Sequence, residues 1–256
     1  MDLSTIKPPV LFLSDVHFGG FSDQENHRIE TELIQLIDYC EQRSIQIFIL
    51  GDLFDYWMEF PDYIPSYGNK LLDRFETYNR NISSIPYITG NHDHWTYGHL
   101  IDRGFKITHE YIQCSLDQKK LMLLHGDGLA NSHFDLPRPL MHRILRNSFF
   151  LKCYRAILNG SAGLTLMKYF SRFNRKLDDP ENHKEMLSNW AKDQLQKSDF
   201  DLIISGHDHI PRREQYDFGS YINLGTFYKH RTLALYNNSA IKLVCWEPET
   251  HSLKPF

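Results

Sequence analysis

Five short apolar runs in this chain each end in a metal-binding type of side chain beside a glycine-containing loop. The runs are rich in β-branched and aromatic residues, which is typical of buried strands. In open α/β sheets, ligands bind at the carboxyl ends of the strands. The pattern therefore predicts an α/β fold that gathers these strand ends into one site. The polar residues that follow the runs are Asp15, His17, Asp52, Asn91, His125, His207 and His209.

Each block alone is weak, because Gly-Asp also makes ordinary turns. Five such blocks in one chain are improbable by accident. Asp15 and His17, like His207 and His209, are two residues apart, so in an extended segment both side chains point the same way. A set of oxygen and nitrogen ligands without thiolate suits manganese, iron or zinc. Two metals need a shared ligand, and Asp52 is the natural bridge; such a site activates water for phosphoester or phosphoanhydride hydrolysis.

The bulk composition fits a globular protein without a thiolate site. The chain has 256 residues, enough for one large domain or for a domain with an insertion. Its four cysteines are scattered without a C-x-x-C pair, which indicates reduced thiols in a cytoplasmic protein. We expect no signal peptide at the amino terminus and no membrane span, because the apolar runs are too short.

The apolar periodicity predicts alternating strands and helices. Strands are expected at 10–13, 47–50, 86–89, 105–109 and 201–205, and helices at 29–39, 67–78 and 181–196. Hairpins are expected at 111–124, with a turn at 117–120, and near the carboxyl terminus, with a turn at Asn237 and Asn238.

Positive charge is concentrated in residues 138–176. This segment holds nine Lys or Arg and no Asp or Glu, whereas the remaining residues hold 19 basic and 32 acidic side chains. The asymmetry indicates an anionic partner: a membrane surface, a phosphorylated substrate or nucleic acid. Residues 131–174 are expected to form two helices joined by a glycine-containing turn. They are either a hairpin packed on the core with a basic solvent face, or a lid for an apolar, anionic substrate at a membrane surface.

Three further residues lie next to the expected ligands. His92, followed directly by Asp93, has the makings of a general acid that a carboxylate orients. Asp55 is either a supporting residue or solvated, and Asp127 is expected to orient a neighbour rather than to bind metal.

The five blocks D-x-H, G-D, G-N-H-D, H-G-D and G-H-x-H, in this order, resemble the calcineurin-like metallophosphoesterase superfamily. The resemblance spans residues 15–209 and implies an αββα sandwich, in which two facing sheets are flanked by helices. It also implies that one metal is held by Asp15, His17, Asp52 and His209, and the other by Asp52, Asn91, His125 and His207. His92 would protonate the leaving group or bind the phosphate, with Asp93 as its partner. Manganese is the expected metal, with iron and zinc as alternatives.

Within the superfamily the chain looks most like the UDP-2,3-diacylglucosamine pyrophosphatase family of lipid A biosynthesis. The shared features are Ser14 to His17, the G-D-L-F-[DE]-x-W form at residues 51–57, the chain length and an insertion between the H-G-D and G-H-x-H blocks. The resemblance implies hydrolysis to UMP and 2,3-diacylglucosamine 1-phosphate, in one domain (1–256) whose insertion at about 131–176 is a lid for the acyl chains. The best-known branch of that family has Arg where this chain has His92.

The implied substrate is a phosphorylated, lipid-linked nucleotide. The implied location is cytoplasmic or peripheral on the inner membrane, with 138–176 facing anionic lipid. Two alternatives stay open: a cytoplasmic phosphodiesterase for nucleotides or another small diester, and a non-catalytic scaffold of the same fold. No nucleic-acid partner is expected, because the acidic body would repel a long polyanion.

Overall fold

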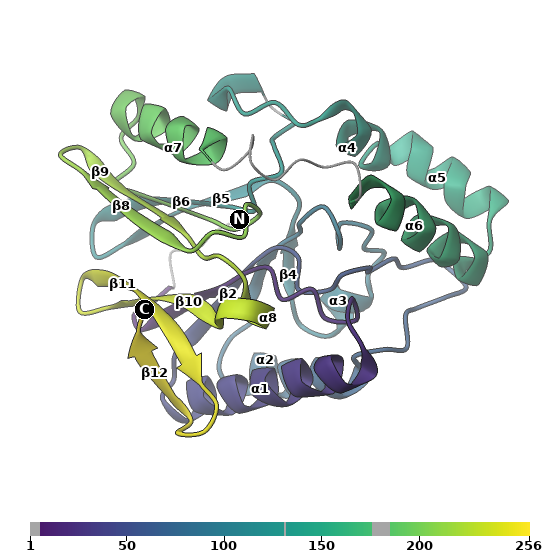
Figure 1. The fold of residues 1–256 in the computed structure, drawn as a ribbon, viewed down its shortest axis with the longest axis horizontal. Coiled ribbons are helices and arrows are strands. Elements are labelled where there is room, and N and C mark those ends of the chain that lie inside the picture. The colour runs from purple at the N-terminus through teal and green to yellow at the C-terminus, as the bar shows by residue number, and fades with distance from the viewer. Residues whose placement is uncertain (1–5, 131, 176–184) are drawn as a thin grey trace.

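Two β-sheets lie face to face in the computed structural model, which describes residues 6–130, 132–175 and 185–256 (Figure 1). One sheet has seven strands in the order β12-β11-β10-β1-β2-β3-β4, and the other has five in the order β5-β6-β7-β9-β8. The strands are β1 (Val10–Leu13), β2 (Gln46–Leu50), β3 (Pro86–Ile88), β4 (Lys106–Thr108), β5 (Tyr111–Leu116), β6 (Lys119–Leu124), β7 (Leu202–Ser205), β8 (Arg212–Tyr216), β9 (Gly219–Asn223), β10 (Thr232–Asn237), β11 (Ala240–Glu247) and β12 (Ser252–Pro255).

The strands that carry the polar blocks are parallel and central. β1, β2, β3 and β4 run parallel in the first sheet, and β6, β7 and β9 run parallel in the second. β1, which is apolar throughout, and β7, which is apolar up to its last residue Ser205, are buried along their whole length, as expected for strands covered on both faces. On its other side β1 pairs antiparallel with β10, with Leu11 opposite Leu235.

Helices cover the outer faces of both sheets and confirm the predicted αββα sandwich. α1 (Asp23–Gln42) and α2 (Asn69–Asn81) pack on the seven-stranded sheet, and α7 (Met186–Lys197) packs on the five-stranded sheet (Figure 1). The core between the sheets joins Phe12 and Phe48 to residues such as Leu123 and Ile204 of the opposite sheet, and all are buried. Short helices α3 (His99–Asp102), η1 (Ser132–Phe134) and α8 (Phe227–His230) lie in connecting loops.

The basic segment forms three helices where two were expected. They are α4 (Leu140–Leu145), α5 (Ser148–Ile157) and α6 (Gly160–Arg175). Asn147 separates the first two, because its side chain accepts hydrogen bonds from the backbone N–H groups of Phe149 and Phe150, both at 3.0 Å, and so caps a new helix. The group packs on the loops that follow β2 and β3 through Phe60, Trp95 and other apolar residues.

Element boundaries differ from the expectation where local turn chemistry decides them. The β5–β6 turn contains only Asp117 and Gln118, both with positive φ, rather than four residues. The β10–β11 hairpin turns at Asn238 and Ser239, one residue later than predicted, since Asn237 still pairs in β10. The helix expected from residue 181 begins at Met186, and residues 181–184 lie outside the described part. Among the described residues, none of the helices has the length and apolar character that a bilayer span requires.

Candidate metal centre

The seven expected ligands lie together at one edge of the sandwich. The loops after β1, β2 and β3 of the first sheet meet the loops after β6 and β7 of the second. The convergence follows from the parallel arrangement, because the carboxyl ends of parallel strands share one edge of a sheet. Most of these side chains are buried, and His209 is the most exposed of them, with 41% of its side chain accessible to solvent.

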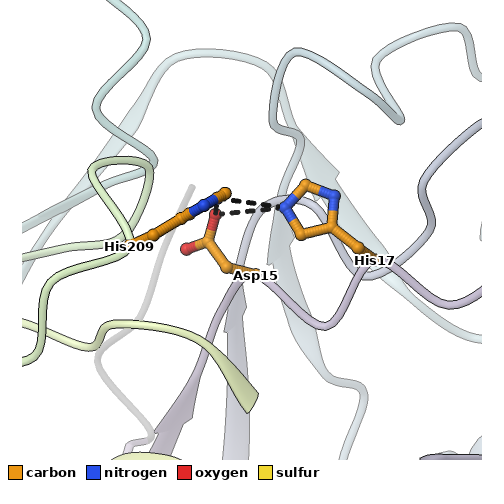
Figure 2. Close-up of side chains that lie close together, drawn as sticks. All are labelled: Asp15, His17 and His209. Atoms are coloured by element: carbon orange, nitrogen blue, oxygen red, sulfur yellow. Dashed lines mark hydrogen bonds and ion pairs between the residues drawn. The ribbon is translucent and has the colours of Figure 1, made fainter. Parts of the chain in front are cut away.

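One group of donors forms around Asp15 (Figure 2). Oδ1 of Asp15 lies 3.2 Å from Nε2 of His209 and 3.7 Å from Nε2 of His17. The two imidazole Nε2 atoms are 3.1 Å apart. Three ligand atoms from two sheets therefore converge on one point, as a bound cation would need.

A second group forms around His125. Its Nε2 lies 3.3 Å from Oδ2 of Asp52 and 3.2 Å from Oδ1 of Asn91, and its ring is 5.1 Å, centroid to centroid, from the ring of His207. Oδ2 of Asp52 is also 3.8 Å from Nε2 of His17. Asp52 thus stands between the two groups, in the position that a shared ligand requires.

The protein holds these rings so that Nε2 of each faces the carboxylates. Nδ1 of His17 donates to Oδ1 of Asp55 at 3.2 Å, and Nδ1 of His125 donates to the carbonyl oxygen of Leu50 at 2.9 Å. Metal-binding histidines are commonly oriented in this way by an acceptor on the second ring nitrogen. Oδ1 of Asp15 is buried and makes no hydrogen bond with a described residue, so it has the character of an unused ligand atom. The donor set fits divalent cations.

The pKa values of the buried histidines and carboxylates show that the acidic groups of the site favour positive charge. Burial alone would lower the pKa of both imidazoles. Asp15 and Asp55 outweigh it at His17, and Asp52 outweighs it at His125, so that each pKa rises to about 10. Burial also opposes ionisation of Asp15 and Asp52, but the histidines around them hold both carboxyl pKa values well below the usual range. Without a metal, protons on His17 and His125 supply the positive charge.

Glycines in the G-D and G-H-x-H blocks allow the loops to approach closely. Gly51 has φ of 92°, and a Cβ there would lie 2.3 Å from Nδ1 of His125. A Cβ on Gly206 would lie 2.0 Å from Oγ of Ser14 and 2.2 Å from Oδ2 of Asp15. Both distances are far too short for a side chain, so glycine is a geometric requirement of the site.

Five of the expected ligand residues themselves adopt positive φ, between 50° and 74°, although they are not glycines. Such backbone is uncommon for residues with a Cβ and is concentrated at functional sites. The residues are Asp15, His17, Asp52, His207 and His209.

The carboxylate beside His92 is Asp55, which corrects the expected pairing with Asp93. Nδ1 of His92 donates to the backbone oxygen of Asp55 at 2.8 Å and lies 3.6 Å from its Oδ1. Asp93 instead accepts hydrogen bonds from the N–H groups of Leu53 and Gly90 and from the hydroxyl of Tyr87. Chain adjacency was a poor guide, because neighbouring side chains in this loop point in different directions. Asp93 ties the loop after β2 to the loop after β3.

Two arginines of the basic segment point inward rather than to an outside anion. Arg138 and Arg146, with 4% and 8% of their side chains exposed, lie near Asp127 and leave Arg143 on the surface. Nη2 of Arg146 is 2.8 Å from Oδ2 of Asp127, and Arg138 also pairs with Glu110 at 3.0 Å. Asp127 therefore orients neighbours, as expected.

Sequence reasoning assigned no role to Ser14 and left that of Asp55 open. Oγ of Ser14 donates to Oδ2 of Asp15 at 2.6 Å and fixes that carboxylate. Asp55 contacts both His17 and His92. The available signals were the position of Ser14 directly before the D-x-H block and that of Asp55 three residues after Asp52.

A family profile and several known proteins match most of the chain. The sequence profile of the Calcineurin-like phosphoesterase family matches residues 8–211. A protein named UDP-2,3-diacylglucosamine hydrolase from Porphyromonas gingivalis is 23% identical over 260 residues, which cover 94% of this chain and 99% of the relative. A protein of the same name from Blochmanniella pennsylvanica is 26% identical over 215 residues, covering 79% of each chain. The solved structure of Yfce, a phosphoesterase from E. coli, aligns with 96% of each chain at 16% identity and a TM-score of 0.49.

Proposed function

Since the chain belongs to the calcineurin-like phosphoesterase family and is therefore a metal-dependent hydrolase, we propose that it hydrolyses UDP-2,3-diacylglucosamine to UMP and 2,3-diacylglucosamine 1-phosphate. The observation that carries this proposal is the pair of histidine–carboxylate groups joined by Asp52. The substrate is inferred from relatives that bear this activity in their names and align over most of the chain.

In this proposal the two groups each hold one divalent cation. Manganese is the proposed ion, with iron and zinc as alternatives, because every donor is an oxygen or an imidazole nitrogen. Bound cations would acidify a water molecule and neutralise charge on the phosphoryl group. The proposed ligands of one ion are Asp15, His17, Asp52 and His209, and those of the other are Asp52, Asn91, His125 and His207.

His92 is proposed to protonate the leaving group or to bind the phosphate. Because Nδ1 donates to the carbonyl oxygen of Asp55, a proton that His92 transfers has to leave from Nε2. Asp55 lies close enough to stabilise the protonated ring. Asp93 supports this arrangement indirectly, because it accepts a hydrogen bond from the N–H of Gly90 in the loop that contains His92.

Helices α4–α6 are proposed to be the substrate-binding lid, within an insertion at about 131–176 of a single domain. They expose large apolar side chains, including Leu140 (71%), Phe149 (74%) and Ile157 (80%), beside exposed Arg143 and Lys152. An apolar surface with positive charges suits a diacylated anion or an anionic lipid surface. On this basis we propose that the protein is a cytoplasmic enzyme that associates peripherally with the inner membrane.

The test is hydrolysis of UDP-2,3-diacylglucosamine by manganese-loaded protein, with bis-p-nitrophenyl phosphate as a parallel substrate. Release of UMP and the diacyl sugar phosphate, together with two bound metals per chain, is the expected result. Hydrolysis of the chromogenic diester alone would retain the metal chemistry but refute the lipid substrate. A purified protein that neither contains nor takes up transition metal would refute the metal centre and leave the scaffold interpretation.

A further inference from the structure

The carboxyl end of α4 is hydrogen-bonded directly to the loop that carries Asn91 and His92. Arg146, which caps α4, sends Nη2 to the carbonyl oxygen of Gly90 at 2.8 Å and Nη1 to the carbonyl oxygen of His109 at 3.0 Å. The same Nη2 donates to Asp127, two residues after His125. The guanidinium of Arg146 therefore joins the backbone next to Asn91 to the loop that carries His125.

A second set of bonds reaches the same loop from the helix backbone. The carbonyl oxygen of Leu145 accepts from Nε1 of Trp95 at 3.1 Å and lies 3.3 Å from Nε2 of His94. A helix end normally leaves its last carbonyl groups without intrahelical partners. Here loop side chains satisfy one of them, so the loop is held from both of its ends.

The loop has no regular secondary structure, so hydrogen bonds to side chains such as Asp93 and Arg146 hold it. From Asn91 to Asp93 the backbone forms only bends, yet Oδ1 of Asn91 is placed 3.2 Å from Nε2 of His125. Moving the Gly90 carbonyl would move the peptide unit from which the side chain of Asn91 extends. The guanidinium is buried and charged, which makes its hydrogen bonds strong and geometrically specific.

We propose that Arg146 is a positioning residue for the Asn91 side of the metal centre, so that the helical insertion is a structural part of that metal site and not only a cover for substrate. The inference rests on the proposed metal centre. We assign this role to Arg146, which caps the carboxyl end of α4, and not to Arg143, which lies within α4 and is exposed. Losing the arginine at 146 should weaken one metal site and spare the other.

The experiment is calorimetric titration of metal-free protein with Mn²⁺, combined with electron paramagnetic resonance of the loaded protein. Changes to residues that orient metal ligands typically lower metal affinity about 10- to 100-fold. For Arg146→Met we expect a loss of this size at one site, an affinity within about twofold of wild type at the other, and loss of the spin-coupled two-manganese signal. His207→Ala should produce the same pattern because it removes a ligand from the same side. Arg143→Met is the matched control and should bind both ions as wild type does.

Arg146→Lys distinguishes positioning from charge and covers the case in which Arg146→Met does not fold. Lysine keeps the charge, but its compact ammonium cannot span the same acceptors, so we expect an intermediate loss at the same site. Wild-type affinity at both sites in Arg146→Lys and Arg146→Met would overturn the inference, and so would equal loss of both ions in a folded variant. Wild-type protein that binds no manganese would instead overturn the metal centre itself.

Discussion

Substitution of Asp93 tests whether Asp55, rather than Asp93, is the carboxylate that acts with His92, because the role assigned to Asp93 is to stabilise the fold. Its carboxylate is buried and accepts from the N–H of Leu53 at 2.8 Å, from the N–H of Gly90 at 2.7 Å and from the hydroxyl of Tyr87. Asp93→Ala leaves three buried donors without their acceptor. At about 1–3 kcal/mol for each, the loss is at least about 3 kcal/mol, a large part of the stability of a typical domain.

Asp93→Asn should lose less than Asp93→Ala. The amide oxygen can still accept one set of hydrogen bonds, but the amide NH₂ replaces the other acceptor and faces a backbone N–H. The hydroxyl of Tyr87 can rotate and accept from this NH₂, whereas the N–H of Leu53 cannot. About 1–3 kcal/mol, the cost of one buried donor, is therefore expected.

The assay is urea unfolding at pH 7.5 with a chelator present, so that metal binding does not contribute, followed by tryptophan fluorescence and circular dichroism. The pH profile of kcat is measured in parallel on metal-loaded protein. The folded Asp93→Asn enzyme should keep the shape of the wild-type profile, whereas Asp55→Asn, which changes the partner of His92, should shift it. A wild-type unfolding midpoint for Asp93→Asn, combined with a shifted profile, would refute the assignment and restore Asp93 as the partner of His92.

Three further results are expected. Asp52→Asn should abolish hydrolysis and lower metal binding at both sites in a metal titration; retention of two tightly bound ions would refute the bridging role. The melting temperature of metal-free protein should fall between pH 6.5 and 10, because the folded state keeps protons on His17 and His125 (pKa about 10) that the unfolded chain releases near 6.5; a flat profile would contradict those pKa values. Arg143→Glu and Phe149→Ser should reduce turnover of the lipid substrate in detergent micelles and leave that of the chromogenic diester unchanged, and equal loss on both would argue against the lid.

The strand ends were predictable because they depend on chain-local signals. An apolar run followed by glycine and a carboxylate marks the end of a buried strand, and parallel pairing then brings distant blocks together. The contact between Asp15 and His209 spans 194 positions in the chain, yet each residue can be recognised as a candidate ligand from the short block of sequence around it.

Side-chain partners were less predictable, because they depend on which loop lies opposite. Asp93 follows His92 in the chain, but the carboxylate that reaches His92 comes from Asp55 in another loop. Arg143 and Arg146 look equivalent in a basic run, yet one lies on the surface and the other is buried against Asp127. On a short helix, a difference of three positions does not reveal which side chain faces inward.

The pairing of β1 with β10 has a consequence for the order in which the chain is made. During synthesis β1 can pair early with β2, but its other neighbour, residues 232–237, emerges only after about 180 more residues. At about 5–20 residues per second, that interval lasts roughly 10–40 s. Throughout it, one edge of the apolar strand that leads to Asp15 stays open, although His207 and His209 are made before β10. A nascent chain stalled before β10 should therefore be a preferred chaperone client, prone to pair the open edge of β1 with another chain.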